Sequence, residues 1–461
     1  MKDSAIGRLH VVVLAAGKGT RMRSNLPKVL HEIAGRSMLA HCLDTAAELN
    51  PATIRVVIGH QGEAVRESQL DRDVEWVWQH EQNGTGHAVQ LGIEGLAAAD
   101  DDRVLVLYAD VPLLGAELLG QLTGSPAVVG LLTVPMDDPT GYGRIIRDER
   151  GRVRRIVEQK DASEAERQVR EVNTGILMAR HGDLVAWLDG LESGNAQGEL
   201  YLTDIVEMAA SDDKTVEAVV AEDVWAVTGV NDRLALARLE RVYQARQAEA
   251  LALAGTTIMD PARLDIRGRL DCGKDVSIDV DCVFEGQVRL GDNVRIGPHC
   301  VLRDCEIGPN STVEAFSHLD GVVTAGDNAI GPYARLRPGA ALDSAAKVGN
   351  FVEVKAARIG ERSKVNHLSY VGDARVGDDC NLGAGTITCN YDGANKHRTE
   401  IDDGVFVGSS VQLVAPVRLG RGATVGAGST ITRDVGEGEL AIARSRQKAI
   451  TGWQRPRKKR E

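Results

Sequence analysis

Two different hydrophobic patterns divide the chain. Between residue 9 and about residue 230, short apolar runs alternate with segments of helical periodicity. Continuous apolar strands that alternate with helices are typical of a mostly parallel sheet covered on both faces. We therefore expect an α/β domain over residues 1–230. The predicted strands cover residues 9–15, 53–59, 74–79 and 103–108, and the clearest predicted helices cover residues 37–48 and 86–98.

The segment over residues 231–254 is rich in Ala, Leu and Arg and contains neither Gly nor Pro. Ala, Leu and Arg are strong helix formers, whereas Gly and Pro are the residues that most disfavour a helix interior. The segment is therefore predicted to form one long helix, which would act as a rigid connector between two domains.

From about residue 256 the hydrophobic period becomes six residues, and Gly often follows the apolar position directly, as at Gly291, Gly297 and Gly408. This spacing is typical of the hexapeptide repeat of a parallel β-helix, in which six residues form one short strand and a corner. The apolar side chain points into a narrow prism, and small residues take the turns. The repeated apolar positions are 266, 272, 278, 284, 290, 296, 302, 307, 313, 330, 336, 342, 348, 354, 359, 365, 371, 376, 382, 407, 413, 419, 425 and 431.

This repeat predicts a left-handed parallel β-helix domain over residues 255–461. The period is interrupted over residues 314–329 and 388–406, where we expect loops that leave the prism. Because β-helices of this type usually trimerise, we also expect a homotrimer.

The composition fits this division of the chain. Of 461 residues 50 are Gly, which exceeds the average of about 7%. There are only 4 Phe, 7 Tyr and 5 Trp, as expected where a narrow prism leaves little room for rings. A hydrophobic content of 43% and a charged content of 26% exclude wholesale disorder.

The net charge of −12 argues against a general nucleic-acid binder. The exception is the basic run over residues 455–460, for which a solvated tail is the simpler interpretation and contact with nucleic acid or a membrane is the alternative. The sequence has no apolar run of about 18 residues, so we expect no transmembrane span. The N-terminal residues do not resemble a signal peptide.

The seven cysteines include no Cys-x-x-Cys pair. This usage indicates reduced thiols in a cytoplasmic protein rather than a disulfide framework or a zinc site. It leaves open whether Cys300 and Cys389 are reactive.

A Gly-rich loop follows the first predicted strand, over residues 14–22, and Lys28 comes soon after it. The loop lacks the third Gly of a dinucleotide-binding fingerprint and the spacing of a Walker A motif. A small loop with exposed backbone N–H groups at a strand–helix junction nevertheless suits phosphates. Lys18, Arg21 and Lys28 could neutralise such phosphates, although a surface turn with solvated cations is the alternative.

These residues resemble the signature of the sugar-nucleotide pyrophosphorylases, a family of nucleotidyltransferases. Together with the hexapeptide repeats, they make the chain similar from about residue 8 to residue 450 to a family of bifunctional enzymes. That family joins N-acetylglucosamine-1-phosphate uridyltransferase to glucosamine-1-phosphate N-acetyltransferase. The resemblance implies a first domain with a Rossmann-like mixed sheet. Further matching segments are residues 82–88, 108–112, 141–144, 156–161, 173–175 and 229–231.

The resemblance also implies roles for residues of the first domain. Arg21 and Lys28 would bind the triphosphate and act in catalysis, since phosphoryl transfer depends mostly on positioning and electrostatics. Gln79, Gly84 and Thr85 would contact the uracil, and Gly143, Glu158 and Asn173 would hold the sugar. The full set for UTP and N-acetylglucosamine 1-phosphate is Leu14, Ala15, Ala16, Gly17, Lys28, Gln79, Gly84, Thr85, Tyr108, Ala109, Asp110, Gly143, Glu158, Asn173 and Asn231.

Asp110 and Asn231 are the metal ligands that the resemblance implies, with Mg²⁺ as the cofactor. Asp110 follows the end of a predicted strand, where ligands bind in open α/β sheets, and a carboxylate suits a hard cation. The alternatives are a turn Asp and an N-cap Asn at the start of the long helix. The family pattern has Gly where this chain has Ala109, so a methyl group could shift the backbone beside the nucleotide.

The β-helix carries residues that a purely structural prism does not need. His367 lies inside the regular repeat, and Asn390 and Tyr391 begin a break in the period. A histidine titrates near neutrality, so it can accept the proton of an amine that attacks a thioester. A structural histidine is the alternative.

The resemblance makes His367 the general base and Glu353 the residue that orients it. Arg337 and Lys355 would bind the sugar 1-phosphate by charge-assisted hydrogen bonds, and Tyr370 and Asn381 would hold sugar hydroxyls. The implied contacts to acetyl-CoA are Ala384, Asn390, Tyr391, Ser409, Ala427 and Arg444. For the small residues of that set, ordinary β-helix turn chemistry is the alternative.

The implied function is a two-step synthesis of UDP-N-acetylglucosamine, a cell-wall and lipopolysaccharide precursor. Glucosamine 1-phosphate would be acetylated first, and UTP would then donate a uridylyl group with release of pyrophosphate. One alternative is a pyrophosphorylase whose β-helix is only a regulatory or assembly module. A non-enzymatic scaffold is the other.

Overall fold

The computed structural model describes residues 7–458. The chain forms two compact units that divide between Tyr243 and Gln244. The division falls inside the long helix α8 (Arg233–Leu253), where the sequence predicts a helix over residues 231–254.

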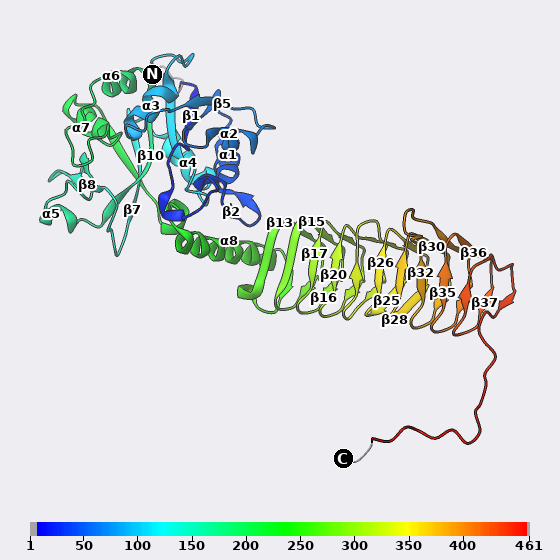
Figure 1. Ribbon diagram of the computed structural model, residues 1–461. Coiled ribbons are helices and arrows are strands. Elements are labelled where there is room, and N and C mark those ends of the chain that lie inside the picture. Colours follow the sequence, from blue (N-terminus) through cyan, green and yellow to red (C-terminus); the bar gives the residue numbers. More distant parts are fainter. Residues whose placement is uncertain (1–6, 459–461) are drawn as a thin grey trace. The chain divides into compact units, whose positions relative to one another are not determined.

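The first unit is built on a mixed sheet with the strand order β11-β7-β10-β6-β1-β4-β5 (Figure 1). All neighbours on this path are parallel except β10, which is antiparallel to both β6 and β7. A β8–β9 hairpin extends from β10. The strands are β1 (Leu9–Leu14), β4 (Thr53–Ile58), β5 (Glu75–Trp78), β6 (Arg103–Tyr108), β7 (Val129–Pro135), β8 (Arg144–Arg147), β9 (Val153–Val157), β10 (Glu171–Arg180) and β11 (Val216–Val220), with a short β2 (Glu32–Ile33) and β3 (Arg36–Ser37) pair beside them.

Helices cover both faces of this sheet, as the continuous apolar strands predict. Along β1, Val11 and Val13 belong to one hydrophobic core and Val12 to another, because successive side chains of a strand point to opposite faces. Helices α1 and α4 pack on the first core, and α3, α6 and α7 pack on the second. The α-helices are α1 (Met38–Glu48), α2 (Gly62–Glu67), α3 (Thr85–Ile93), α4 (Ala116–Gly124), α5 (Glu164–Arg167), α6 (His181–Asp189) and α7 (Asp204–Ser211).

The helix predicted over residues 86–98 is shorter in the structure. It ends at Ile93, and Gly95 has a φ of 64°, which is left-handed backbone that favours Gly. The helical pattern therefore continues in the sequence beyond the point where the backbone turns away.

The second unit is a left-handed parallel β-helix. Its strands form two parallel sheets whose members repeat in chain order (Figure 1). One sheet comprises β12 (Thr257–Ile258), β14 (Ser277–Ile278), β16 (Arg295–Ile296), β19 (Thr312–Val313), β22 (Ala329–Ile330), β25 (Lys347–Asn350), β28 (Lys364–His367), β31 (Asn381–Leu382), β34 (Phe406–Val407), β37 (Thr424–Val425) and β39 (Leu440–Ala441). The other comprises β13 (Leu264–Cys272), β15 (Cys282–Leu290), β17 (Val301–Arg303), β18 (Glu306–Ile307), β20 (His318–Asp320), β21 (Val323–Thr324), β23 (Arg335–Leu336), β24 (Ala341–Leu342), β26 (Glu353–Lys355), β27 (Arg358–Ile359), β29 (Tyr370–Gly372), β30 (Ala374–Val376), β32 (Ile387–Cys389), β33 (Thr399–Ile401), β35 (Gln412–Val414), β36 (Val417–Leu419) and β38 (Thr430–Ile431).

The first predicted interruption of the β-helix is wrong. Residues 314–329 stay in the prism, with Leu319 and Thr324 at the inward positions, 0% and 4% exposed. Thr324 is accommodated because its Oγ1 accepts a hydrogen bond from the backbone N of Gly308 at 2.9 Å. The six-residue pattern of apolar residues does not predict this coil, because one of its inward residues is polar.

The second predicted interruption is wrong at its ends. Thr388 is buried inside the prism, and Ile401 returns the chain to it. Residues between them form a hairpin, in which Tyr391 pairs with Lys396. The chain therefore leaves the prism over a shorter stretch than residues 388–406.

Two further features bear on the expectations from composition. Within residues 7–458, no helix combines the length and the apolar character that crossing a membrane requires. All seven cysteines are free, and Cys282, Cys300, Cys305 and Cys380 are buried in the β-helix.

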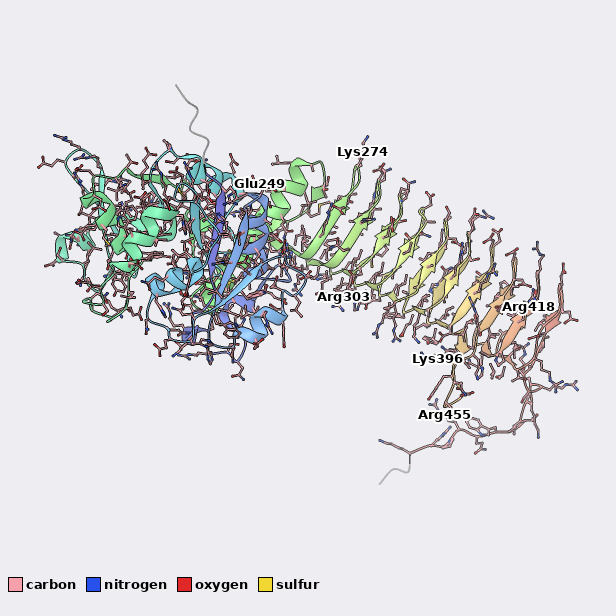
Figure 2. All side chains as sticks on the ribbon, turned by 90° about the horizontal axis from the view of Figure 1, so that it is seen from above. Glu249, Lys274, Arg303, Lys396, Arg418 and Arg455 are labelled. Atoms are coloured by element: carbon pink, nitrogen blue, oxygen red, sulfur yellow. The ribbon has the colours of Figure 1, made fainter. Side chains whose placement is uncertain are left out.

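The outside of the β-helix is charged. Side chains such as Arg303 and Arg418 project from the outside of the coils (Figure 2).

Candidate active sites

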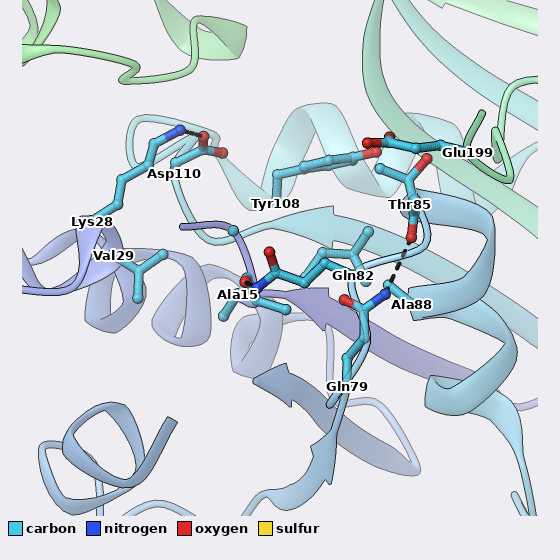
Figure 3. A pocket seen from close by; sticks show the side chains of 14 residues that line it. Ala15, Lys28, Val29, Gln79, Gln82, Thr85, Ala88, Tyr108, Asp110 and Glu199 are labelled. Atoms are coloured by element: carbon cyan, nitrogen blue, oxygen red, sulfur yellow. Dashed lines mark hydrogen bonds and ion pairs between the residues drawn. The ribbon is translucent and has the colours of Figure 1, made fainter. Parts of the chain in front are cut away.

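A pocket opens in the first unit beyond the carboxyl ends of β1 and β6 (Figure 3). This is the edge of a parallel sheet where α/β proteins bind ligands. The chain runs from β1 directly into the Gly-rich loop, which therefore forms one wall. The lining residues are Leu14, Ala15, Ala16, Gly17, Lys28, Val29, Gln79, Gln82, Gly84, Thr85, Ala88, Tyr108, Asp110 and Glu199.

One end of the pocket is formed by Gln79 and the turn at the start of α3. Gln79 is 4% exposed, and its Nε2 donates to the carbonyl oxygen of Gly84 at 3.2 Å. Gly84 has a φ of 105°, and a Cβ there would lie 2.5 Å from the backbone oxygen of Leu200. Only Gly fits this turn. Gln79 and Gly84, which are predicted to contact uracil, are therefore held by backbone that tolerates no side chain.

The other end of the pocket is charged. Lys28 Nζ contacts Asp110 Oδ2 and donates to Asn231 Oδ1 at 3.0 Å (Figure 3 shows the Lys28–Asp110 pair). Arg21 donates to the same Asn231 oxygen at 2.8 Å. The structure thus brings together Arg21, Lys28, Asp110 and Asn231. Of these, Arg21 in the Gly-rich loop and Asn231 before α8 lie more than 200 positions apart in the chain.

This arrangement offers two oxygen ligands of the kind that a hard divalent cation takes. Asp110 and Asn231 direct one carboxylate oxygen and one amide oxygen at a single cationic group, the Lys28 ammonium. Mg²⁺ is usually held by one or two carboxylates together with substrate phosphates and waters. Asp110 and Asn231 would hold the ion.

A third group of predicted residues lies at the β8–β9 hairpin. Asn173 donates from its backbone N to the carbonyl oxygen of Gly143 at 2.8 Å. A Cβ on Gly143 would lie 2.9 Å from Ile156 Cγ2 and 3.3 Å from Glu158 Oε1. Burial raises the pKa of Glu158, whose Oε1 accepts from Thr203 at 3.3 Å.

Tyr108 lies between this group and the pocket. Its ring fills the space beside Gly175, where a Cβ would lie 2.7 Å from Tyr108 Cε2. Burial raises the pKa of the Tyr108 hydroxyl, which is therefore a neutral hydrogen-bonding group at neutral pH.

Ala109, predicted to contact the nucleotide, does not line this pocket. It is 0% exposed and packs in the core with neighbours such as Leu107 and Val111. The methyl group that departs from the family pattern therefore occupies core space rather than the pocket wall.

Four further residues line the pocket but were not predicted as site residues from the sequence. They are Val29, Gln82, Ala88 and Glu199. Gln82 and Ala88 belong to the matching segment 82–88 but were given no role, and Gln82 Nε2 donates to the carbonyl oxygen of Ala16 at 2.6 Å. Glu199 carries no local signal, because the loop that contains it reaches the pocket only through tertiary contact with the Gly84 turn.

In the β-helix, His367 lies at the end of β28 and faces Asn350 of β25 on the preceding coil. His367 Nδ1 lies 2.8 Å from Asn350 Oδ1. Since an amide oxygen only accepts, Nδ1 carries the proton and Nε2 keeps a lone pair that can take one. Asn350 was not among the predicted site residues, and the predicted orienting residue, Glu353, instead accepts from Arg337 at 2.8 Å.

A second cluster in the β-helix surrounds Asp373. Asn390 contacts Asp373 Oδ2 and donates to the Tyr370 hydroxyl at 3.4 Å. Lys355 Nζ lies 3.9 Å from Asp373. Lys396, on the hairpin that leaves the prism (Figure 2), meets Lys355, and the hydrogen bond with Lys355 together with its positive charge lowers the pKa of Lys396. Sequence reasoning missed Asp373 and Lys396.

The small residues predicted to contact acetyl-CoA stack on successive coils. Ser410 donates from its backbone N to Ala384 O at 2.7 Å, and Gly428 does so to Ser409 O at 2.8 Å. Arg444 reaches the carbonyl oxygen of the next residue in this column, Ala427. Asn381 lies on β31, two strands beyond β25 in the sheet that also carries His367.

The fold and these sites define a transferase with a nucleotidyltransferase domain followed by a hexapeptide-repeat domain. The profile of the MobA-like NTP transferase domain matches residues 11–141, and that of the bacterial transferase hexapeptide (six repeats) matches residues 272–304 and 398–433. Nucleotide-transfer enzymes of this class typically use a divalent metal.

Full-length relatives identify the particular family. The chain is 58% identical over 97% of its length to 96% of the bifunctional protein GlmU of Alkalilimnicola ehrlichii. It is 56% identical over 98% of its length to the whole GlmU of Azoarcus sp., and 53% identical over 98% to the whole GlmU of Ralstonia nicotianae. The chain belongs to the bifunctional GlmU family. It is therefore a bifunctional enzyme of UDP-N-acetylglucosamine synthesis, with uridyltransferase and acetyltransferase activities, as the resemblance predicted.

Proposed function

We propose that the uridyltransferase site is the pocket of the first unit, with Mg²⁺ as its metal. The convergence of Lys28, Arg21 and Asn231 beside Asp110 is the observation that carries this proposal. Bound Mg²⁺ would neutralise phosphate charge as the α-phosphorus is attacked. The functional domain would cover residues 1–230, joined by the helix at 231–254 to an acetyltransferase domain at 255–461.

The chain's own residues would position the two reactants. Lys28 and Arg21 would bind phosphate oxygens, and their positive charge would favour the charge distribution of the transition state. Gln79 and the Gly84 turn would hold the uracil. The sugar 1-phosphate would lie against Gly143, Glu158 and Asn173, so that one of its phosphate oxygens attacks the α-phosphorus in line and pyrophosphate leaves.

The acetyltransferase site would centre on His367. Its Nε2 would take a proton from the amine of glucosamine 1-phosphate as the nitrogen attacks the thioester carbonyl, and would return that proton to the CoA thiolate as the C–S bond breaks. Lys355 and Arg337, with Lys396 as a further cation, would bind the phosphate. The column of Ala384, Ser409 and Ala427 would accept the pantetheine arm, because small side chains leave room along it.

We propose that the protein works as a homotrimer. Four side chains at one corner of the prism stack on successive coils, with ring centroids 4.7, 4.9 and 5.2 Å apart for His299–Phe316, Phe316–Tyr333 and Tyr333–Phe351. Phe316, Tyr333 and Phe351 are 47–55% exposed. An exposed apolar strip of this kind is typical of a protein interface.

We also propose a cytoplasmic setting. Such a setting keeps thiols reduced, which fits the seven free cysteines.

One assay tests both activities. The full chain is incubated with glucosamine 1-phosphate, acetyl-CoA, UTP and Mg²⁺, and free thiol and pyrophosphate are followed. A chelator should stop pyrophosphate release while thiol release continues. Uridyl transfer that persists without a divalent metal would overturn the metal assignment.

The trimer is tested separately, by size-exclusion chromatography with light scattering. A mass that is not three times that of the chain would overturn it.

A further inference from the structure

Arg144 is a charged side chain in an unusual place. It begins β8 and is 2% exposed, the largest of the side chains that are almost fully buried. Arg is almost never fully buried unless it is paired with an opposite charge. The two hydrogen bonds of this guanidinium go instead to uncharged oxygens, and its Nε has no hydrogen-bond partner among the described residues.

The two contacts of Arg144 join two separate segments. One is the carbonyl oxygen of Tyr142, in the loop before β8, and the other is Gln159 Oε1 at 2.7 Å, just after β9. The same Gln159 oxygen accepts from the backbone N of Gly141 at 3.3 Å. Arg144 and Gln159 therefore bind the 139–143 loop at two points.

Both segments carry residues of the sugar subsite. Gly143 follows Tyr142 directly, and a Cβ there would lie 2.9 Å from Ile156 Cγ2 and 3.3 Å from Glu158 Oε1, so the backbone at Gly143 packs closely against this segment. Glu158 precedes Gln159, and the Arg144 charge opposes the rise that burial causes in the pKa of Glu158. The buried guanidinium thus fixes both sides of the surface on which the sugar would lie.

We propose that Arg144 is a positioning residue of the sugar 1-phosphate subsite, which holds the 139–143 loop against Gln159 so that Gly143 and Glu158 meet the sugar in one geometry. The inference rests on the proposed assignment of Gly143 and Glu158 to the sugar. Arginine suits this position because its planar guanidinium group can donate to two fixed oxygens at once. A Lys ammonium group cannot do this.

The test measures KM for N-acetylglucosamine 1-phosphate and for UTP in the full chain. Arg144→Lys should raise the sugar KM about tenfold or more, since it loses one charge-assisted hydrogen bond, while the KM for UTP changes less than about twofold. Arg147→Lys is the matched control, because Arg147 lies on the same strand and pairs with Glu171 at the surface. It should leave both constants unchanged.

A second pair of variants guards against misfolding of Arg144→Lys. Gln159→Leu removes the shared acceptor from a half-buried position, whereas Gln159→Glu keeps an acceptor there. The first should raise the sugar KM and the second should retain a near-normal value. If Arg144→Lys and Gln159→Leu alter both KM values together, or neither, the positioning role is wrong.

Glu158→Gln separates this inference from the assignment on which it rests. If it raises the sugar KM while Arg144→Lys and Gln159→Leu do not, the subsite is right and Arg144 only stabilises the fold. If Glu158→Gln leaves the sugar KM unchanged, the sugar does not lie at this hairpin and the proposed function of the hairpin fails.

Discussion

Asn350 and His367 face each other across two adjacent coils of the β-helix, with Asn350 Oδ1 2.8 Å from His367 Nδ1. The parallel register of β25 and β28 sets this contact, which lies between residues 17 positions apart. The contact fixes the imidazole tautomer and leaves the lone pair of Nε2 free for the proposed role as base. A side chain one coil away thereby decides which nitrogen can perform the chemistry.

The first prediction concerns this pair. His367→Ala should lower the turnover of acetyl transfer about 10²-fold or more, as loss of a general base typically does. Asn350→Ala should lower it less, about tenfold, because the base remains but is no longer held in one tautomer. Thiol release from acetyl-CoA measures both. Glu353→Gln is the comparison, and a larger loss there than in Asn350→Ala would make Glu353 the orienting residue.

The second prediction separates the two activities. Asp110→Asn should abolish uridyl transfer, because it removes the carboxylate beside Lys28 and Asn231. Acetyl transfer should be unchanged, since the residues proposed for it all belong to the β-helix. Pyrophosphate and thiol release are measured on the same preparation. Wild-type uridyl transfer in this variant would contradict the metal assignment.

The third prediction tests the polar coil of the prism. Thr324→Val restores the aliphatic pattern but leaves the backbone N–H of Gly308 without its partner, so it should destabilise the protein by about 1–3 kcal/mol. The urea midpoint of the full chain measures the effect. Thr430→Val, at an exposed position on β38, is the control and should change little. Equal or greater stability of Thr324→Val would show that the hydrogen bond contributes nothing.

The fourth prediction is a loss of stability in acid. Asp102 is almost fully buried, which by itself raises its pKa. Hydrogen bonds from the backbone of Ala99 and from Arg8, together with His10, outweigh burial and hold the pKa of Asp102 well below its ordinary value.

Because the folded pKa of Asp102 is lower than the unfolded one, its contribution is fully present above about pH 4 and is lost as the pH falls further. Urea midpoints measured from pH 6 downward should therefore decline more steeply below about pH 4 in the wild type than in Asp102→Asn. Parallel declines in the two proteins would show that other carboxylates cause the acid sensitivity.

Much of the fold can be predicted from the sequence, and particular residues show why. Val11, Val12 and Val13 are all apolar because both faces of β1 are buried, and the sequence records this as a continuous run. Thr324 and Thr388 lie at inward positions but interrupt the hydrophobic pattern, because hydrogen bonds with the backbone of the preceding coil, not hydrophobicity, satisfy their hydroxyl groups.

The candidate sites divide in the same way. Motifs predict Asp110, Lys28 and His367 as site residues, because these residue types suit the proposed chemistry and lie near glycines or at the end of a strand. Glu199, Asn350 and Lys396 were missed, since each reaches its site through a loop or a coil that local sequence does not place.

The sequence by itself determined the two domains, the hexapeptide period and the residues suited to uridyl and acetyl transfer, because periodicity and glycine placement are local properties. Only the tertiary structure decided that Lys28 lies between Asp110 and Asn231 and that His367 faces Asn350. The same holds for the burial of Arg144 against the 139–143 loop. Such contacts join residues far apart in the chain, and packing and strand register, not local pattern, set their distances.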